Sequence, residues 1–466
     1  MTRQASEPAL PRSGAAAVLA TVAGQFFGGE LPVRLRAWDG SEAGPATGPV
    51  LVLHSRQALR RLLWHPGELG LAQAYVTGEL DVDGDITDGL RAVWQAARNR
   101  GLADARPAGT KLAGTKLGGT KLPLAGWAAA AGAAIRLGVP GSRPRTPASQ
   151  ARIRGRLHSK SRDQAVIAHH YDVPAAFYEL ILDPQMAYSC ALWTSADPDY
   201  TLADAQRDKL DAICGKLELT PGQRLLDVGC GWGSLAIHAA RSYGAQVTAV
   251  TLAAEQAAYV RAKVARLGLS DLVTVVNQDY RDITGGQYDA AASVEMGEHV
   301  GDREYPAFCA LLRDRLRPGG RLLIQQMSRG SRAPGGGAFI EAYIAPDMHM
   351  RPLGQTVSLL DGAGLEILGV EAMRKDYTRT IRAWLASLEQ HWAEARTMIG
   401  AEAARVWRLY LAGGALAFEE GRMGVDQILA RAAGGPAVGP ARDTTRDTTR
   451  DTTPGSGRPA GAGRPR

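Results

Sequence analysis

Six short apolar runs alternate with helical segments between residues 163 and 432, and this alternation restricts the possible folds more than any other feature. The predicted strands are 224–228, 246–251, 273–276, 288–294, 321–326 and 365–370. Strands that alternate with helices pair into a mainly parallel sheet with helices on both faces, which is an α/β fold. Ligands of such sheets bind beyond the carboxyl ends of the strands. We therefore expect the functional site at that edge.

The rest of the chain divides into four further parts. Residues 15–97 are predicted to form a small α+β domain, in which 33–40 and 50–53 form hairpin strands, 57–63 a helix and 78–82 a short strand. Residues 98–162 repeat GTKL three times and are expected to be a basic flexible linker. Residues 1–14, and the tail 433–466 with its three RDTT repeats, are expected to be disordered because they offer little to bury.

The positive charge of the chain is concentrated in the predicted linker. Between Arg98 and Asp163 there are 14 Lys or Arg and two Asp, a net charge of +12, whereas the whole chain carries +7. Such a segment suits an anionic membrane surface or a nucleic acid, or is simply a solvated linker. Its one aromatic residue, Trp127, is too few for base stacking, which argues against nucleic acid.

The sequence has neither a compact signal-peptide pattern nor an apolar run of the length that a bilayer requires. We expect a cytoplasmic protein that binds peripherally to the inner membrane face, and an oligomer is compatible with the sequence. The cysteine and histidine residues do not fall at the spacing of metal ligands, so no metal site is predicted.

A glycine-rich turn follows the first strand of the α/β region. The strand contains Asp227 and leads into Gly229 and Gly231, after which Ser234 opens an apolar helix. Glycines let the backbone turn sharply beside a ligand, and the helix supplies free N–H groups. The pattern lacks the last glycine spacing of the dinucleotide fingerprint. It resembles motif I of the class I S-adenosylmethionine methyltransferases, which implies their Rossmann-like fold and S-adenosylmethionine as cofactor; a tight turn without a ligand is the alternative.

Three longer blocks narrow this resemblance. The stretch V-T-A-V-T-L-A-A-E-Q at 247–256, the block that contains Y-S-C-A-L-W at 188–193 and the E-H-V-G motif at 298–301 resemble the cyclopropane synthase and mycolic acid methyltransferase family. The resemblance implies a cofactor-binding role for Tyr188, Ser189, Asp227, Gly229, Gly231, Thr251, Leu252, Gln256, Asp279, Tyr280 and Arg281.

The resemblance also implies a specific reaction. An alkene attacks the sulfonium methyl group and becomes a carbocation, from which a base must remove a proton while water is excluded. In the family this base is a bound bicarbonate, which a cysteine, a glutamate, a histidine, a tyrosine and a backbone group hold. Matched motif by motif, Cys190, Glu298 and Tyr377 are the predicted ligands, with His299 beside Glu298 as a further catalytic candidate.

The chain departs from the family at the histidine. Gln325 stands in its place, and Met327 supplies the backbone contact. A glutamine side chain can donate a hydrogen bond to an anion but cannot shuttle a proton. The predicted product on an unsaturated phospholipid acyl chain is therefore either a cyclopropane or a methylene or methyl branch of the tuberculostearic type, for which a separate reductase saturates the methylene group.

Structural roles for these residues remain alternatives. Cys190 is of a type that is often a small buried apolar residue, Glu298 and His299 can cap the following helix, and Tyr377 can belong to the core. Under these alternatives the chain is a catalytically idle lipid-binding or nucleoside-binding protein. A small-molecule or nucleic-acid methyltransferase would not need the Y-S-C and E-H blocks.

Overall fold

The computed structural model describes residues 14–27, 29, 31–99, 124–153, 155–170, 173–330 and 336–433. The disorder that the sequence predicts for 1–14 and 433–466 therefore lies outside the described residues, apart from Gly14 and Ala433. Among the described helices, none combines the length and the apolar composition that crossing a bilayer demands.

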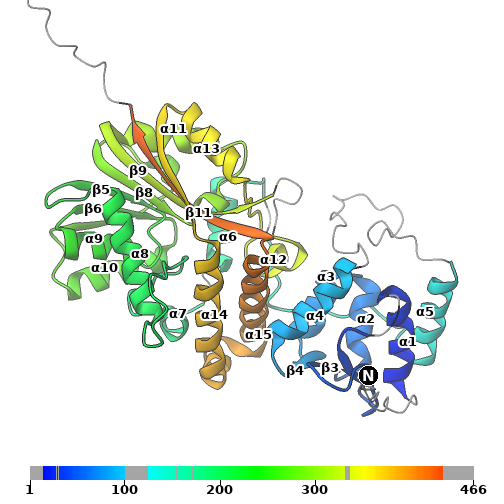
Figure 1. Ribbon diagram of the computed structural model, residues 1–466. Coiled ribbons are helices and arrows are strands. Elements are labelled where there is room, and N and C mark those ends of the chain that lie inside the picture. The colour runs from blue at the N-terminus through cyan, green and yellow to red at the C-terminus, as the bar shows by residue number, and fades with distance from the viewer. Residues whose placement is uncertain are drawn as a thin grey trace, which may run out of the picture. The chain divides into compact units, whose positions relative to one another are not determined.

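A seven-stranded sheet forms the centre of the larger part of the chain (Figure 1). Its order is β10-β11-β9-β8-β5-β6-β7. The strands are β5 (Arg224–Val228), β6 (Gln246–Thr251), β7 (Val273–Asn277), β8 (Tyr288–Val294), β9 (Leu316–Arg329), β10 (Leu365–Ala372) and β11 (Met423–Ala432). Strands β7, β6, β5, β8 and β9 are parallel, and the strand order reverses between β5 and β8. This reversal is the point at which open α/β sheets bind ligands.

Helices cover both faces of the sheet, as the sequence predicts. Leu225 faces a core built with α8 (Leu202–Lys216), α9 (Ser234–Tyr243) and α10 (Ala254–Arg266). The next residue, Leu226, faces the opposite core, which α11 (Tyr305–Arg315) and α13 (Leu353–Gly362) complete. Alternation of side chains along a strand buries both faces of a covered sheet.

Strand β11 was missed by the sequence prediction. It inserts between β9 and β10 and is antiparallel to both, with Val425 opposite Met327. It follows two long helices, α14 (Arg374–Gln390) and α15 (Trp392–Glu419), which lie side by side (Figure 1). These helices bring the aromatic residues of the C-terminal region to the carboxyl edge of the sheet.

The N-terminal part is an α+β unit built on a four-stranded sheet of order β2-β1-β3-β4. Its elements are α1 (Ala15–Phe27), β1 (Arg34–Arg36), β2 (Glu42–Ala43), β3 (Val50–Leu53), α2 (Arg56–Trp64), α3 (Glu68–Val76), β4 (Leu80–Asp83) and α4 (Ile86–Asn99). The expectation that 33–40 and 50–53 form a hairpin was wrong, because β1 and β3 pair in parallel and the short β2 forms the hairpin with β1.

The predicted flexible linker is ordered over much of its described length. It contains α5 (Leu124–Arg136) and the start of α6 (Lys160–His170), and the segment between them is tied to α2. Arg60 donates to Val139 O at 2.8 Å, and the buried Arg61 donates to Arg145 O at 2.9 Å. The GTKL repeats lie outside the described residues. The prediction was therefore wrong for 124–153, where backbone carbonyls satisfy buried guanidinium groups.

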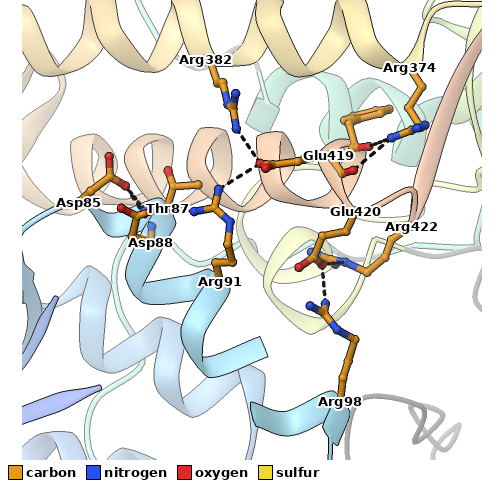
Figure 2. A network of polar contacts seen from close by, with 11 residues as sticks. Asp85, Thr87, Asp88, Arg91, Arg98, Arg374, Arg382, Glu419, Glu420 and Arg422 are labelled. Atoms are coloured by element: carbon orange, nitrogen blue, oxygen red, sulfur yellow. Dashed lines mark hydrogen bonds and ion pairs between the residues drawn. The ribbon is translucent and has the colours of Figure 1, made fainter. Parts of the chain in front are cut away.

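Ion pairs connect α4 with the C-terminal helices (Figure 2). Glu419, near the end of α15, accepts from Arg91 of α4 and from Arg382 of α14. Glu420 accepts from Arg98 and from Arg422. Figure 2 shows both carboxylates between guanidinium groups from different elements.

Two short helices and two turns complete the described elements. They are α7 (Ala175–Ile181), the short turns η1 (Tyr280–Asp282) and η2 (Gly297–His299), and α12 (Ala338–Tyr343), which packs on α3.

Candidate active site

A cavity opens at the carboxyl ends of β5, β6, β7 and β8. The structure brings all eleven residues with a predicted cofactor role to its wall: Tyr188, Ser189, Asp227, Gly229, Gly231, Thr251, Leu252, Gln256, Asp279, Tyr280 and Arg281. His299 and Glu295 also line it. Cys190, Gln325 and Tyr377 do not line it but bond to Glu295, and Glu298 bonds to Met327 N.

The turn after β5 gives the cavity its floor. Gly229 and Gly231 have φ values of +84° and +52°, which favour glycine. A Cβ built on Gly229 would lie 2.7 Å from Met296 Cγ, whereas one on Gly231 would have no heavy atom within 4 Å. A ligand can therefore approach this backbone closely.

Asp227 Oδ2 and Gln256 Nε2 lie on residues of the cavity wall and are buried without a hydrogen-bond partner among the described residues. The amide of Gln256 is oriented by Thr251, whose hydroxyl donates to Gln256 Oε1 at 2.8 Å. Burial raises the pKa of Asp227 to about 7. Buried polar groups are normally satisfied, so these atoms fit the ammonium and hydroxyl groups of S-adenosylmethionine.

Arg281 closes one side of the cavity. Its guanidinium group contacts Asp279, which begins η1, with an Arg281 Nη2 to Asp279 Oδ2 distance of 2.6 Å. It also reaches Asp163 Oδ2 at 2.8 Å and donates to His158 O at 3.2 Å. His158 and Asp163 line the cavity as well, so Arg281 couples the start of α6 to the end of β7.

Two residues of α8 that the sequence analysis did not single out position the Tyr188–Cys190 loop. Gln206 Nε2 donates to Ala187 O and Ser189 O, and Lys209 Nζ donates to Ser189 Oγ at 2.9 Å. Both side chains are buried. Burial lowers the pKa of Lys209. Their helical spacing of three residues was the available signal, because it places two polar groups on a face that is otherwise apolar.

The carboxylate at the centre of the predicted anion site belongs to Glu295, not to Glu298. Glu295 Oε1 accepts from Cys190 N and from Gln325 Nε2, each at 2.8 Å, and Glu295 Oε2 accepts from Tyr377 Oη at 2.5 Å. Three of the predicted catalytic residues thus converge, but on a glutamate that was not predicted as a site residue.

Glu298 occupies a neighbouring place. Its Oε1 accepts from Met327 N at 2.5 Å, while Oε2 is buried without a partner in the described structure. Burial, followed by the charge of Glu295, raises the pKa of Glu298 to about 8. Glu298 is therefore mainly protonated at neutral pH. The two neighbouring carboxyl groups then carry one negative charge, on Glu295.

A chain of amides fixes the orientation of Gln325. Lys216 Nζ donates to Gln427 Oε1 at 2.5 Å, and Gln427 Nε2 donates to Gln325 Oε1 at 2.9 Å. Because Gln325 Oε1 is the acceptor in this bond, Gln325 Nε2 must face Glu295 as a donor. Gln427 lies on β11, the strand that the sequence prediction missed.

Cys190 and His299 contribute differently from the prediction. The Cys190 thiol donates to Ala191 O and Met373 O, and burial raises its pKa well above the usual value, so it remains a neutral thiol whose backbone N–H holds the carboxylate. Burial lowers the pKa of His299 to about 4, which leaves the imidazole neutral at pH 7.

Aromatic rings pack around Tyr377, which donates to the Glu295 carboxylate. The Tyr377 ring lies 4.6 Å from that of Phe418 and 6.0 Å from that of Trp384, and Tyr188 packs 5.2 Å from Trp384. Ring faces carry negative potential that attracts cations, and their bulk excludes water. The site therefore places a half-buried carboxylate beside an aromatic cluster, a combination that suits a positively charged carbon.

Comparison with known proteins places the chain in a family. A family model described as "Mycolic acid cyclopropane synthetase" matches residues 158–428. A probable fatty acid methyltransferase of Mycobacterium tuberculosis is 36% identical over 412 residues, which cover 86% of this chain and 91% of that protein. The tuberculostearic acid methyltransferase UfaA1 of the same organism is 32% identical over 442 residues, which cover 90% of this chain and 92% of the relative.

Solved structures agree with this placement. The cyclopropane synthase MmaA2 from Mycobacterium tuberculosis has a TM-score of 0.55 and 28% identity, and the match covers 57% of this chain and 98% of that one. The mycolic acid cyclopropane synthase CmaA1, in complex with S-adenosylhomocysteine and CTAB, has a TM-score of 0.54 and 29% identity over the same shares of the two chains. The chain is thus a member of the mycolic acid cyclopropane synthetase family of S-adenosylmethionine-dependent methyltransferases.

Proposed function

We propose that this enzyme transfers the methyl group of S-adenosylmethionine to the carbon–carbon double bond of an unsaturated acyl chain in a membrane phospholipid. The observation that carries the proposal is that the half-buried carboxylate of Glu295 borders the cofactor cavity and bonds to Tyr377, which belongs to an aromatic cluster. Methyl transfer to oxygen or nitrogen does not create a carbocation. A pocket with one buried anion, aromatic faces and little water suits a carbocation.

The residues of the chain divide the work between binding and deprotonation. Asp227, Gln256 and the glycine turn would hold the cofactor, which supplies an electrophilic methyl group when bound. The aromatic rings around Tyr377 would exclude water from the cation. Loss of a proton from the transferred methyl group then ends the reaction.

The names of the relatives support an acyl substrate and two kinds of product. Those relatives are called fatty acid methyltransferases, cyclopropane-fatty-acyl-phospholipid synthases or, for UfaA1, a tuberculostearic acid methyltransferase. We propose either a cyclopropane or a methylene branch as the product here. A methylene branch requires a separate reductase to become a methyl branch, whereas a cyclopropane does not.

The test uses purified enzyme, S-adenosylmethionine labelled in its methyl group, and vesicles of phospholipid with monounsaturated acyl chains. We expect labelled lipid, and mass spectrometry of the released fatty acids distinguishes a ring from a methylene group. Cofactor binding by calorimetry without transfer to any unsaturated lipid would refute the proposal and favour an idle binding protein. Label on a small molecule instead of a lipid would favour another methyltransferase class.

We also propose that the enzyme docks on an anionic membrane surface. Leu63 and Trp64 at the end of α2 and Ile135 at the end of α5 are exposed by 56%, 47% and 71%. The bond from Arg60 to Val139 O joins α2 to the arginine-rich segment that follows α5. Apolar side chains among cations suit the interface of an anionic bilayer. Cosedimentation with anionic vesicles, but not with zwitterionic ones, should therefore fall when Leu63 and Trp64 are replaced by serine.

A further inference from the structure

The carboxylate of Glu295 occupies the position in which an anion was expected. Three groups of the described structure donate hydrogen bonds to its two oxygens. They are the Cys190 backbone N–H, the Gln325 amide and the Tyr377 hydroxyl. An ionised carboxylate only accepts hydrogen bonds, so three converging donors match the ionised form.

Bicarbonate does not fit beside this carboxylate. Cys190, Gln325 and Tyr377, from the predicted anion site, already contact Glu295, and the predicted backbone donor, Met327 N, contacts Glu298. A further anion would have to lie between two carboxyl groups in a buried pocket, where like charges repel strongly. The donor set of an anion site is present, but a side chain of this protein fills it.

The backbone at Glu295 supports a functional reason for this arrangement. Glu295 follows directly after β8 and has a φ of +52°, in the left-handed region that side chains other than glycine adopt rarely. Such a conformation is strained and tends to persist at functional sites. The bond from Glu295 N to Gln325 O, at 2.6 Å, fixes the conformation and aims the side chain at the donors.

We propose that Glu295 is the built-in base of this enzyme and replaces the bound bicarbonate of the family mechanism. The inference rests on the proposed function. It assigns the proton-accepting atom to a residue that borders the cofactor cavity, which a base in this reaction must do.

The step balances without a further reactant. The π electrons of the alkene form a bond to the methyl carbon, and the carbon–sulfur bond breaks with its electron pair on sulfur. The transferred methyl group then loses a proton to the Glu295 carboxylate. The C–H electron pair either closes the cyclopropane ring or, after a hydride shift, forms the methylene double bond.

The electrostatics of the pocket suit a base of this kind. Burial raises the pKa of Glu295, while the donors, and Lys209 at longer range, oppose the rise. A carboxylate with a raised pKa takes up a proton more readily than one in water. Protonated Glu298, the neutral thiol of Cys190 and neutral Tyr377 add no second negative charge.

The test compares the natural enzyme with Glu295→Gln and Glu295→Gly in buffer freed of carbon dioxide, with and without added bicarbonate. We expect the natural enzyme to turn over equally in both buffers. Glu295→Gln should lose at least about 100-fold in kcat with unchanged affinity for S-adenosylhomocysteine, because positioned bases contribute about 10²–10⁴-fold. Glu295→Gly, which vacates the donors, should regain at least about tenfold when bicarbonate is added.

Asp426→Asn is the matched control, because Asp426 is a buried carboxylate outside the pocket that accepts from Ser328 Oγ. Its kcat should stay within about threefold of the kcat of the natural enzyme. Loss of a catalytic base changes kcat by far more than this. Bicarbonate stimulation of the natural enzyme by more than that margin, or an equally active Glu295→Gln, would overturn the inference.

A binding measurement separates this inference from the proposed function. Carbon-13 bicarbonate should show line broadening with Glu295→Gly and none with the natural enzyme, whether or not lipid is methylated. Broadening with the natural enzyme would overturn the inference, while absence of transfer to any lipid would overturn the function alone.

Discussion

Replacing Tyr377 with phenylalanine should move the pH dependence of turnover to higher pH. The change removes one hydroxyl, which donates to Glu295 Oε2 at 2.5 Å, and leaves the ring that packs on Phe418. A hydrogen bond to a charged group contributes about 1.5–3 kcal/mol. At about 1.36 kcal/mol for each pKa unit, the pKa of Glu295 should rise by about 1–2 units.

The sign follows from the form that the hydrogen bond stabilises. Tyr377 favours ionised Glu295, so its removal favours the protonated form. A base acts only when ionised, so kcat increases with pH through the pKa of this group. We therefore expect the acidic limb of the kcat profile to shift upward by about 1–2 pH units, with a smaller loss of rate at high pH.

The assay is the initial rate of label transfer to lipid from pH 5 to 9 at saturating cofactor. The charged or titratable neighbours Lys209 and Glu298 are retained, so the shift reports the hydroxyl alone. Tyr343→Phe is the control, because the Tyr343 hydroxyl is buried in α12 without a hydrogen-bond partner among the described residues. A fall in kcat for Tyr377→Phe with an unmoved acidic limb would refute the reasoning.

Three further changes test other parts of the structure. Gly229→Val should abolish binding of S-adenosylhomocysteine in calorimetry, since the new side chain meets Met296 and φ is +84°; binding of normal affinity would contradict the cavity assignment. Lys209→Met should raise the pKa of Asp227, because the lysine charge lowers it. As the pH falls, the variant should then lose cofactor affinity at a higher pH than the natural protein, which a calorimetric pH series measures. Glu419→Gln should lower the free energy of unfolding by less than about 1 kcal/mol at pH 7, since its arginine pairs are largely exposed. Because the folded-state pKa of Glu419 is lowered, this difference should disappear in denaturant titrations as the pH falls through that pKa.

Periodicity located the parallel strands closely. The predicted limits of β5, β6 and β8 coincide with the observed strands, because continuous apolar runs between turn residues mark strands that are buried on both faces. Strand β11 has no such run: Asp426 and Gln427 interrupt it, and side chains of β9 bond to both. Sequence alone does not reveal those partners.

The site shows the same division. Motifs identified the residues around the cavity, because close backbone approach requires glycine and defined turns. The prediction assigned the central carboxylate to Glu298, whereas the backbone turn after β8 directs Glu295 to the donors. The backbone φ of Glu295 decides which of the two glutamates faces the donors. A positive φ at a glutamate cannot be predicted from the residues beside it in the sequence.

The amide chain from Lys216 to Gln325 has a polarity that originates near the surface of the protein. A primary amide keeps almost the same shape when it is turned by half a rotation, so packing alone does not distinguish its oxygen from its nitrogen. The ammonium group of Lys216, whose side chain is 28% exposed, settles the choice for both glutamines. Neutralising that one cation would let each amide invert, and an inverted Gln325 would present oxygen to a carboxylate. If Glu295 is the base that we propose, its proton affinity thus depends on a lysine that does not line the cofactor cavity.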